Sequence, residues 1–370
     1  MPRGVVLGGG IAGLATAVGL SRAGWAVSVH ERATDLRPLG AALSLWENAA
    51  AALDGLGLLA PVAEAGAPIR SMLVADDRGR PIIGPRAIAG RAMIITRAAL
   101  QQALIAALGD VELHLGRTVT GVREVAGGVE VRFVGERSIA ADLVIDAAGI
   151  GSPLASVHEG TGPSFAGYSG VLALSEPIAG ASSGAACEFW GRGERFGVLE
   201  LGEGRRYWFY MRDAAEGSAA PCLATVAGRA SGWPALVEET IASTRADRLI
   251  PFAVHAKPPP TRLGRGRVIA VGDAAHAMEP NLGQGACQGI EDAAALSAIA
   301  RRLPPERMLA AFEAMRLKRV RGIVRQAAQG RMGAHGPPIR QAITRALLRG
   351  APDWLHDRVI GSVQTMPDYR

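Results

Sequence analysis

Cysteine is scarce in this sequence, and the few cysteines lie far apart. Only three occur among 370 residues, Cys187, Cys222 and Cys287, and no Cys-x-x-Cys pair is present. This usage excludes a disulfide-stapled scaffold and offers no structural zinc motif. The seven histidines show neither H-x-x-x-H nor H-E-x-x-H spacing, so no metal site is expected either. A reducing cytoplasm is the compartment that fits.

Segments long and apolar enough to cross a membrane are also missing. The uncharged run at residues 4–20 follows Arg3 and superficially resembles a secretion signal. It is too short and too rich in glycine to span a bilayer, and no other stretch approaches the required length. The sequence also lacks a Gly-x-Ser-x-Gly motif, which leaves hydrolase chemistry without support.

The charge of the chain raises the question of nucleic acid. The net charge is +6 and the isoelectric point is near 9.8, with arginine supplying almost all of the base. The densest run, RLKRVRGIVRQAAQGR at residues 316–331, is interpreted as a solvated helix face because no nucleic-acid motif accompanies it. We therefore expect no nucleic-acid partner and only a mild preference for anionic substrates or surfaces.

The composition itself is that of an ordinary globular protein. The chain is 49% hydrophobic and 20% charged, and its length favours two domains. Residues 4–31 predict one βαβ unit, residues 165–212 an antiparallel sheet and residues 222–247 helices. The chain after residue 284 predicts helix, with a break at residues 335–338. The predicted fold class is α/β: a Rossmann-like domain, discontinuous in sequence, with an inserted antiparallel β-sheet domain and a helical C-terminus.

A glycine-rich turn follows the first predicted strand. Gly8, Gly10 and Gly13 form G-x-G-x-x-G between that strand and a helix, the context in which this pattern binds a dinucleotide. Glu31 ends the next strand, where its carboxylate could accept hydrogen bonds from a ribose diol, and Arg32 could stack on adenine or face solvent. The acid favours FAD or NAD over NADP.

A second strand-to-helix turn lies more than 250 residues further on, in VGDAAHAMEPNLGQGACQG at residues 271–289. Asp273 could accept hydrogen bonds from a polyol. Gly283, Gln284 and Gly285 would offer backbone N–H groups and the positive end of a helix to a negatively charged ring. One long dinucleotide held at both ends explains why the chain needs two such turns.

These two motifs resemble those of the FAD-dependent aromatic hydroxylases related to para-hydroxybenzoate hydroxylase. The similarity is greatest to the single-component urate, hydroxynicotinate and salicylate hydroxylases, and it covers nearly the whole chain. GAALSLWENAAAALDGLGL at residues 40–58 and ITRAALQQAL at residues 95–104 match the same group. The resemblance implies an FAD-binding domain at residues 1–68, 92–162 and 264–302, a substrate domain at 69–91 and 163–263, and C-terminal helices at 303–370.

The resemblance also implies which residues bind the cofactor. It assigns the AMP half of FAD to Gly8, Gly10, Ile11, Ala12, Gly13, Glu31, Arg32 and Val119. It assigns the pyrophosphate, the ribityl chain and the isoalloxazine to Ala41, Arg97, Asp273, Gly283, Gln284, Gly285 and Ala286. Pro280 would lie over the face of the flavin where oxygen reacts.

The implied reaction is a monooxygenation by a cytoplasmic monomer or homodimer. NAD(P)H would reduce FAD, and O2 would form a C4a-hydroperoxyflavin that hydroxylates or epoxidises a small aromatic or polyketide-like substrate. Arg195 and Tyr207, expected on adjacent strands, would bind or activate the ring, unless they face outward. Trp190, Trp208 and Phe209 are expected in the core. His276 is expected to be structural, and Cys287 either a buried packing residue or a thiol of lowered pKa.

One stretch departs from the family pattern. The family carries a second fingerprint, Gly-Ala-Asp-Gly followed by a serine and an arginine, and here the stretch reads DAAGIGSPLAS. Ala148 replaces the acid and Ala155 the arginine, whereas Ser152 is kept, and Asp146 could take over part of the role. The departure keeps two alternatives open: a flavin oxidase or dehydrogenase on the same fold, and a non-catalytic FAD-fold binding protein.

Overall fold

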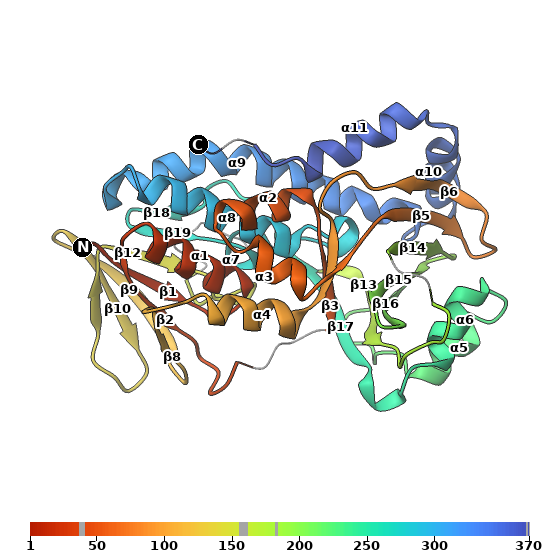
Figure 1. Cartoon of the computed structure of the whole chain (residues 1–370), viewed down its shortest axis with the longest axis horizontal. Coiled ribbons are helices and arrows are strands. Elements are labelled where there is room, and N and C mark those ends of the chain that lie inside the picture. The colour runs from red at the N-terminus through yellow and green to blue at the C-terminus, as the bar shows by residue number, and fades with distance from the viewer. Residues whose placement is uncertain (37–40, 155–161, 182–183, 368, 370) are drawn as a thin grey trace.

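The computed structural model describes residues 1–36, 41–154, 162–181, 184–367 and 369. The molecule is elongated, with a mainly parallel sheet and its helices at the end that carries the N-terminus and a large second sheet at the other end (Figure 1). The fold is therefore the α/β class that the sequence predicts.

The first sheet has six strands in the order β18-β19-β12-β1-β2-β8. Its members are β1 (Arg3–Leu7), β2 (Ala26–His30), β8 (Glu112–His114), β12 (Leu143–Asp146), β18 (Gly264–Arg265) and β19 (Val268–Ala270). All neighbouring pairs are parallel except the edge pair of β18 and β19. Every residue of β12 and β19 is buried, as expected for parallel strands covered on both faces.

The two faces of this sheet are covered by different layers. Val6 of β1 packs among helices that include α1 (Ile11–Arg22), α4 (Arg97–Ala106) and α8 (Gly285–Ala300). Val5 and Leu7 face the opposite way, onto the small antiparallel sheet of β9 (Val119–Val125), β10 (Gly128–Phe133) and β11 (Ile139–Ala141). This period-two alternation fixes the side from which α1 and α8 reach the carboxyl ends of the strands.

The second sheet has seven strands in the order β17-β13-β16-β15-β14-β5-β6. Its members are β5 (Ser71–Asp76), β6 (Pro81–Ala87), β13 (Ser164–Leu174), β14 (Ala185–Trp190), β15 (Glu194–Gly202), β16 (Arg205–Asp213) and β17 (Ile250–Ala256). Its pairs are antiparallel, as the sequence predicts, except that β5 runs parallel to β14. The exception arises because β5 and β6 come from an earlier, separate segment of the chain.

One face of this sheet is packed against helices. Phe196 and Val198 of β15 and Trp208 and Tyr210 of β16 form a buried cluster. The helices that cover it are α5 (Leu223–Arg229) and α6 (Ala235–Ala242). Trp208 is therefore a core residue, as expected, and the residues that alternate with these four on β15 and β16 lie on the other face.

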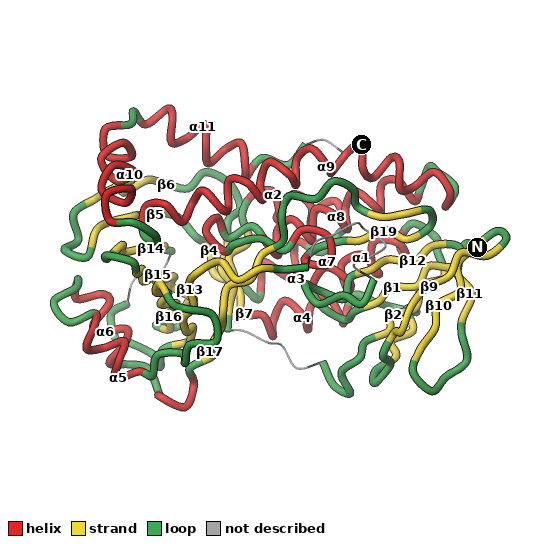
Figure 2. Tube along the Cα trace, turned by 180° about the vertical axis from the view of Figure 1, so that it is seen from behind, coloured by secondary structure: helices red, strands yellow, loops and turns green. Residues whose placement is uncertain are grey.

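The remaining elements join the two sheets and close the molecule. A three-stranded sheet consists of β3 (Ala42–Leu45), β7 (Met93–Thr96) and β4 (Ala67–Pro68), near the helices α2 (Glu47–Gly55) and α3 (Leu59–Glu64). The chain ends in α9 (Pro305–Gln329), α10 (Pro338–Gly350) and α11 (Asp353–Gln364), with the expected break before α10. Figures 1 and 2 show α9 and α11 along the same long side of the molecule and α10 at the end of the second sheet. Among the described residues, no helix has the length and apolar character needed to span a membrane.

Candidate functional site

The turn between β1 and α1 is shaped by its glycines. Gly8 has φ +112°, and a Cβ there would lie 2.3 Å from the carbonyl oxygen of Ala147 on the neighbouring strand. A Cβ on Gly13 would lie 2.0 Å from the carbonyl oxygen of Gly8, so only glycine lets α1 start so close to the strand. Gly10 differs, because nothing lies within 4 Å of the Cβ position there. The turn is thus packed against the protein at Gly8 and Gly13 and open at Gly10. A pyrophosphate needs such an opening to approach the backbone closely.

The N-terminus of α1 is capped by no side chain of the described residues. Gly10 caps the helix without a side-chain hydrogen bond. Ile11, Ala12 and Gly13 form the first turn, in which Ile11 and Gly13 are buried and Ala12 is half-buried. The free N–H groups of such a turn and its positive dipole end favour a phosphate group.

A pocket of about 170 Å³ opens beside this turn. Glu31, Arg32 and Val119 all line it, so the structure brings together the three residues proposed for the adenosine end. The Glu31 carboxylate also accepts hydrogen bonds from the backbone N–H groups of Gly9 (2.7 Å) and Ala33 (2.9 Å). Glu31 therefore supports the turn as well as lining the pocket.

His30 lines the same pocket, although no sequence pattern points to it. Its ring stacks on that of His114 at 4.8 Å and lies 4.9 Å from that of Phe133. Burial, together with the nearby positive charges of His114 and Arg117, lowers the pKa of His30 to about 4. The imidazole is therefore neutral at pH 7, and the pocket holds no charge at this point.

The second glycine turn packs directly on the first. Gly272 has φ +56°, and a Cβ there would lie 2.8 Å from the Cβ of Ala12. A Cβ on Gly289 of α8 would lie 2.9 Å from the same atom. Residues more than 250 positions apart are thus in contact because both Gly272 and Gly289 lack side chains. One ligand can reach both turns.

Asp273 begins the short helix α7 (Asp273–His276) and is exposed, although the residues around it are buried. Its Oδ1 lies 4.0 Å from the position a Cβ would take on Gly285, so Asp273 and the turn that carries Gly283, Gly285 and the half-buried Ala286 border one space. Arg97 lies across it: burial lowers the pKa of Arg97, whereas the negative charge of Asp273 opposes this shift. The backbone N–H of Arg97 bonds to the carbonyl oxygen of Ala41 at 3.2 Å, which places Ala41 beside the same space.

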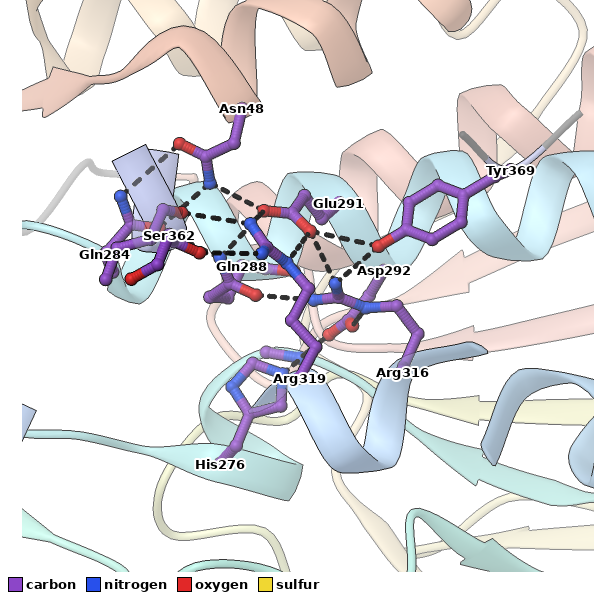
Figure 3. A network of polar contacts seen from close by, with 12 residues as sticks. Asn48, His276, Gln284, Gln288, Glu291, Asp292, Arg316, Arg319, Ser362 and Tyr369 are labelled. Carbon is purple, nitrogen blue, oxygen red and sulfur yellow. Dashed lines mark hydrogen bonds and ion pairs between the residues drawn. The ribbon is translucent and has the colours of Figure 1, made fainter. Parts of the chain in front are cut away.

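Gln284 was expected to offer its backbone N–H group to the site. Its side chain is buried, with Oε1 accepting hydrogen bonds from Asn48 and Gln288, both at 2.9 Å (Figure 3). The side chain therefore points into the protein and leaves the backbone N–H as the group that Gln284 can offer. Asn48 and Gln288 also bond to the Glu291 carboxylate, at 2.6 and 2.8 Å.

A buried charge network lies behind this turn (Figure 3). Arg316 of α9 is fully buried and bonds to Glu291 at 2.5 Å and to Asp292 at 2.8 Å. Arg319 also binds Glu291, at 2.8 Å, and the Tyr369 hydroxyl bonds to the same carboxylate at 3.1 Å. Burial alone would raise the pKa of Glu291, but the charges of Arg316 and Arg319 lower it below its ordinary range. This network was not predicted, although an arginine-rich helix and a Glu-Asp pair in another, apolar helix are a sequence signal for it.

Asp292 connects the network to the glycine turn of the Gly-Asp motif. Its Oδ2 accepts a hydrogen bond from the N–H of Gly272 at 2.9 Å and pairs with His276 Nε2 at 2.7 Å. His276 is buried, which confirms its structural role. Cys287 is fully buried, and burial raises the pKa of its thiol to about 12, so the alternative of a lowered thiol pKa is wrong.

The face of the second sheet opposite α5 and α6 carries the residues proposed for the substrate. Arg195 and Tyr207 lie on the adjacent strands β15 and β16 and point to the same face, opposite the α5–α6 layer. Phe209 lies between them: its ring is 6.3 Å from that of Tyr207, and the Arg195 guanidinium lies 5.6 Å from its centre. Phe209 is half-buried and packs against two core clusters from this face, in agreement with the expectation that it belongs to the core. Burial raises the pKa of Tyr207 to about 12, which keeps its hydroxyl protonated.

Arg195 joins this face to the turn at Pro280. Its Nη2 donates to Asn281 Oδ1 at 2.6 Å and its Nη1 to Glu188 at 3.1 Å. Asn281 follows the exposed Pro280 in the 3₁₀ turn η3 (Pro280–Leu282), so all three residues proposed for catalysis lie in one region. Among the described residues the Nε of Arg195 has no hydrogen-bond partner although it is buried. Trp190 lies elsewhere, in a separate core cluster, as expected.

The departure at residues 146–149 also has a structural explanation. Asp146 is buried at the end of β12, and its carboxylate accepts hydrogen bonds from the N–H of Ala148 (3.1 Å) and the hydroxyl of Ser152 (2.6 Å). Asp146 therefore holds the turn that follows the strand. Ala148 lines the pocket beside the first turn and brings no polar side-chain group to it. Ala155 lies outside the described residues.

Comparisons with known proteins agree with this geometry. A family described as "FAD binding domain" matches residues 3–327. The aurachin C monooxygenase/isomerase of Stigmatella aurantiaca is 35% identical over 332 residues, 86% of each chain. The FAD-dependent urate hydroxylase of Klebsiella pneumoniae is 30% identical over 375 residues, 97% of each chain. The crystal structure of K. pneumoniae HpxO complexed with FAD and uric acid superposes with a TM-score of 0.89 at 29% identity, covering 98% of this chain and 96% of that one. The chain belongs to the FAD-binding monooxygenase family.

Proposed function

We propose that the protein is an FAD-dependent monooxygenase that hydroxylates or epoxidises a small, electron-rich aromatic substrate with NAD(P)H and O2. One observation carries the proposal: Arg195, Tyr207 and Phe209 form a face with one cation, one neutral donor and one ring beside the space bordered by Asp273 and Arg97. The names of the relatives point the same way, since urate and aurachin C are the compounds on which those proteins are said to act.

The residues of both glycine turns fit FAD. The first turn and the pocket at Glu31 would hold the AMP half, because Gly10 leaves open the space that a pyrophosphate needs. Asp273, Arg97 and the backbone at residues 283–286 would hold the ribityl chain and the ring. When bound, FAD supplies the electron transfer and the activation of O2, which no side chain of the protein can supply.

The substrate face has the means to orient a ring. Tyr207 can donate a hydrogen bond to a ring oxygen, and the unpartnered Nε of buried Arg195 can donate another. Phe209 offers an apolar surface on which an aromatic substrate would lie. The protein's part in the reaction is then to position the ring carbon and exclude water.

An anaerobic titration tests the proposal. The purified protein is loaded with FAD, and NADH or NADPH is added with and without phenols, quinolones and purines while the visible flavin band is recorded. We expect a ring compound to accelerate bleaching of the band. Admission of air should then yield a product heavier by one oxygen atom.

Two other outcomes would contradict the proposal in different ways. Bound flavin that neither nucleotide reduces would favour the oxidase or dehydrogenase alternative and would point to Ala148, where the family acid is missing. Reduction that releases only hydrogen peroxide with every ring compound would show that the face at Arg195 does not hold such substrates.

A further inference from the structure

The two C-terminal helices carry an exposed apolar surface. Six of the ten large hydrophobic residues that are exposed in the described structure lie here: Ile339 (76%), Ile343 (56%), Leu347 (70%), Trp354 (62%), Leu355 (38%) and Val359 (53%). We call these six the hairpin face. Such a concentration of exposed apolar side chains in one place marks an interaction site more often than scattered surface residues do.

The α10 part of the hairpin face is exposed because the opposite side of α10 is packed against the protein. Ile339, Ile343 and Leu347 are spaced four residues apart and form one stripe along the helix. The other side of α10 is fixed to the second sheet: Arg345 donates to the carbonyl oxygens of Gly333 and Gly191, and Arg349 to Asp76. The stripe is therefore the outer side of a helix whose inner side is already occupied, at the end of the molecule that α10 occupies in Figure 1.

The rim of the hairpin face is positively charged. Arg340 and Arg358 are exposed, and within the described ranges neither has a hydrogen-bond or ion-pair partner. The two acids of α11, Asp353 and Asp357, are both paired with Arg86 of β6. Unpaired positive charge around an apolar stripe is the pattern of a helix that lies on an anionic lipid surface.

A second copy of the chain fits this face less well. In a two-fold interface the same patch meets itself, so the unpaired Arg340 and Arg358 of both copies would come together. Each copy also carries a net charge of +6, which adds long-range repulsion. Like charges disfavour this pairing, whereas anionic headgroups would neutralise the same arginines.

We propose that the hairpin face docks the protein onto an anionic lipid surface, with the stripe of α10 and Trp354 in the headgroup region. The proposal does not depend on the substrate or on the reaction. It is tested with the FAD-loaded protein and two kinds of vesicle, phosphatidylcholine alone and phosphatidylcholine mixed with phosphatidylglycerol. We expect sedimentation with the mixed vesicles, at least tenfold weaker binding to phosphatidylcholine alone, and release by added salt.

Trp354 gives a direct readout. The chain has six tryptophans, and the other five are at most 9% exposed, so exposure-sensitive fluorescence reports mainly on Trp354. Mixed vesicles should shift its emission to the blue, and brominated acyl chains should quench it. Trp354→Phe should abolish both changes.

Substitutions in the α10 stripe distinguish a lipid surface from a second copy of the chain as the partner of the hairpin face. Ile343→Glu with Leu347→Glu should abolish sedimentation and leave turnover in solution unchanged, since neither residue contacts the candidate site. Val134→Glu is the matched control, because Val134 is equally exposed (62%) but lies after β10. Equal binding to both kinds of vesicle, or no binding to either, would overturn the proposal. So would a dimer in analytical ultracentrifugation that the double substitution dissociates, because the occupant would then be a second copy.

Discussion

The two sides of the candidate site are built in different ways. The nucleotide side is made of backbone: Gly8 and Gly13 could not carry a Cβ without meeting a carbonyl oxygen at 2.3 or 2.0 Å. The substrate side is made of side chains on alternate positions of β15 and β16, where Arg195 and Tyr207 share a face only because of strand register. A site built from the backbone requires glycine at a fixed spacing. A site built from side chains on strands can use many residue types. The nucleotide side of the candidate site can therefore be predicted from the sequence, whereas the substrate side hardly can.

The largest effect on FAD binding is expected from a single methyl group in the first turn. Gly13→Ala places a Cβ 2.0 Å from a carbonyl oxygen that cannot move without shifting β1. We expect at least about a 100-fold loss of FAD affinity, or about 2.7 kcal/mol, together with a lower unfolding temperature. Flavin fluorescence titration and thermal unfolding measure the two.

Two matched glycines sharpen this prediction. Gly228→Ala lies on an exposed helix with nothing within 4 Å of the new Cβ, and should leave FAD binding unchanged. Gly10→Ala also meets no protein atom, so it should preserve the stability of the apoprotein and still weaken FAD binding. Unchanged affinity in Gly10→Ala would mean that the pyrophosphate does not approach this turn.

The largest effect on the stability of the fold is expected from the side chains that support the second turn. Arg316→Met leaves the buried carboxylates of Glu291 and Asp292 without their main counter-charge. Breaking such a network from one side costs about 3–5 kcal/mol in the free energy of unfolding. Arg325→Met on the same helix is exposed and should change it by less than about 0.5 kcal/mol. Denaturant titration compares the two variants, and a small loss in Arg316→Met would show that the network does not stabilise the fold.

The same difference between backbone and side chains separates what could be predicted from the sequence from what could not. The βαβ unit, the two glycine turns and the helical C-terminus were predictable because turn residues and periodicity encode them locally. The direction of the Gln284 side chain was not, since it depends on Asn48 and Gln288, which lie on different helices. The face on which Phe209 meets the core was not predictable, because strand alternation alone does not tell which face is covered by α5 and α6. Arg316 was read as part of a solvated face, although its partners on α8 bury it completely.

The nucleotide side also contains a side chain with a pH dependence. The pKa of His30 is lowered to about 4, from an unfolded value of about 6.5, so the unfolded chain binds more protons between these pH values. The contribution of neutral His30 to the free energy of unfolding is fully present above pH 6.5. It is lost as the pH falls toward 4, and the loss reaches about 3 kcal/mol. His30→Gln removes the titrating group.

Unfolding free energies of the wild type and His30→Gln, measured from pH 4 to pH 8, isolate this contribution from that of the carboxylates. The difference between the two should be constant above pH 7 and change steadily below 6.5. Parallel curves throughout would show that His30 takes up a proton in the folded protein as easily as in the unfolded one.

The smallest effect is expected on the substrate side. Tyr207→Phe removes one hydroxyl that burial keeps protonated, since its pKa is about 12, and leaves the ring in place. Losing one neutral hydrogen bond to a substrate costs about 0.5–1.5 kcal/mol, which corresponds to roughly a two- to tenfold lower kcat/KM. Tyr210→Phe is the matched control: its hydroxyl bonds to Glu194 and Arg229 on the opposite face, so the loss should appear in stability and not in kcat/KM. FAD affinity should stay at the wild-type value in both variants. If Tyr207→Phe instead weakened FAD binding and left kcat/KM unchanged, Tyr207 would belong to the cofactor, and the two sides of the site would not be separable in the way their construction suggests.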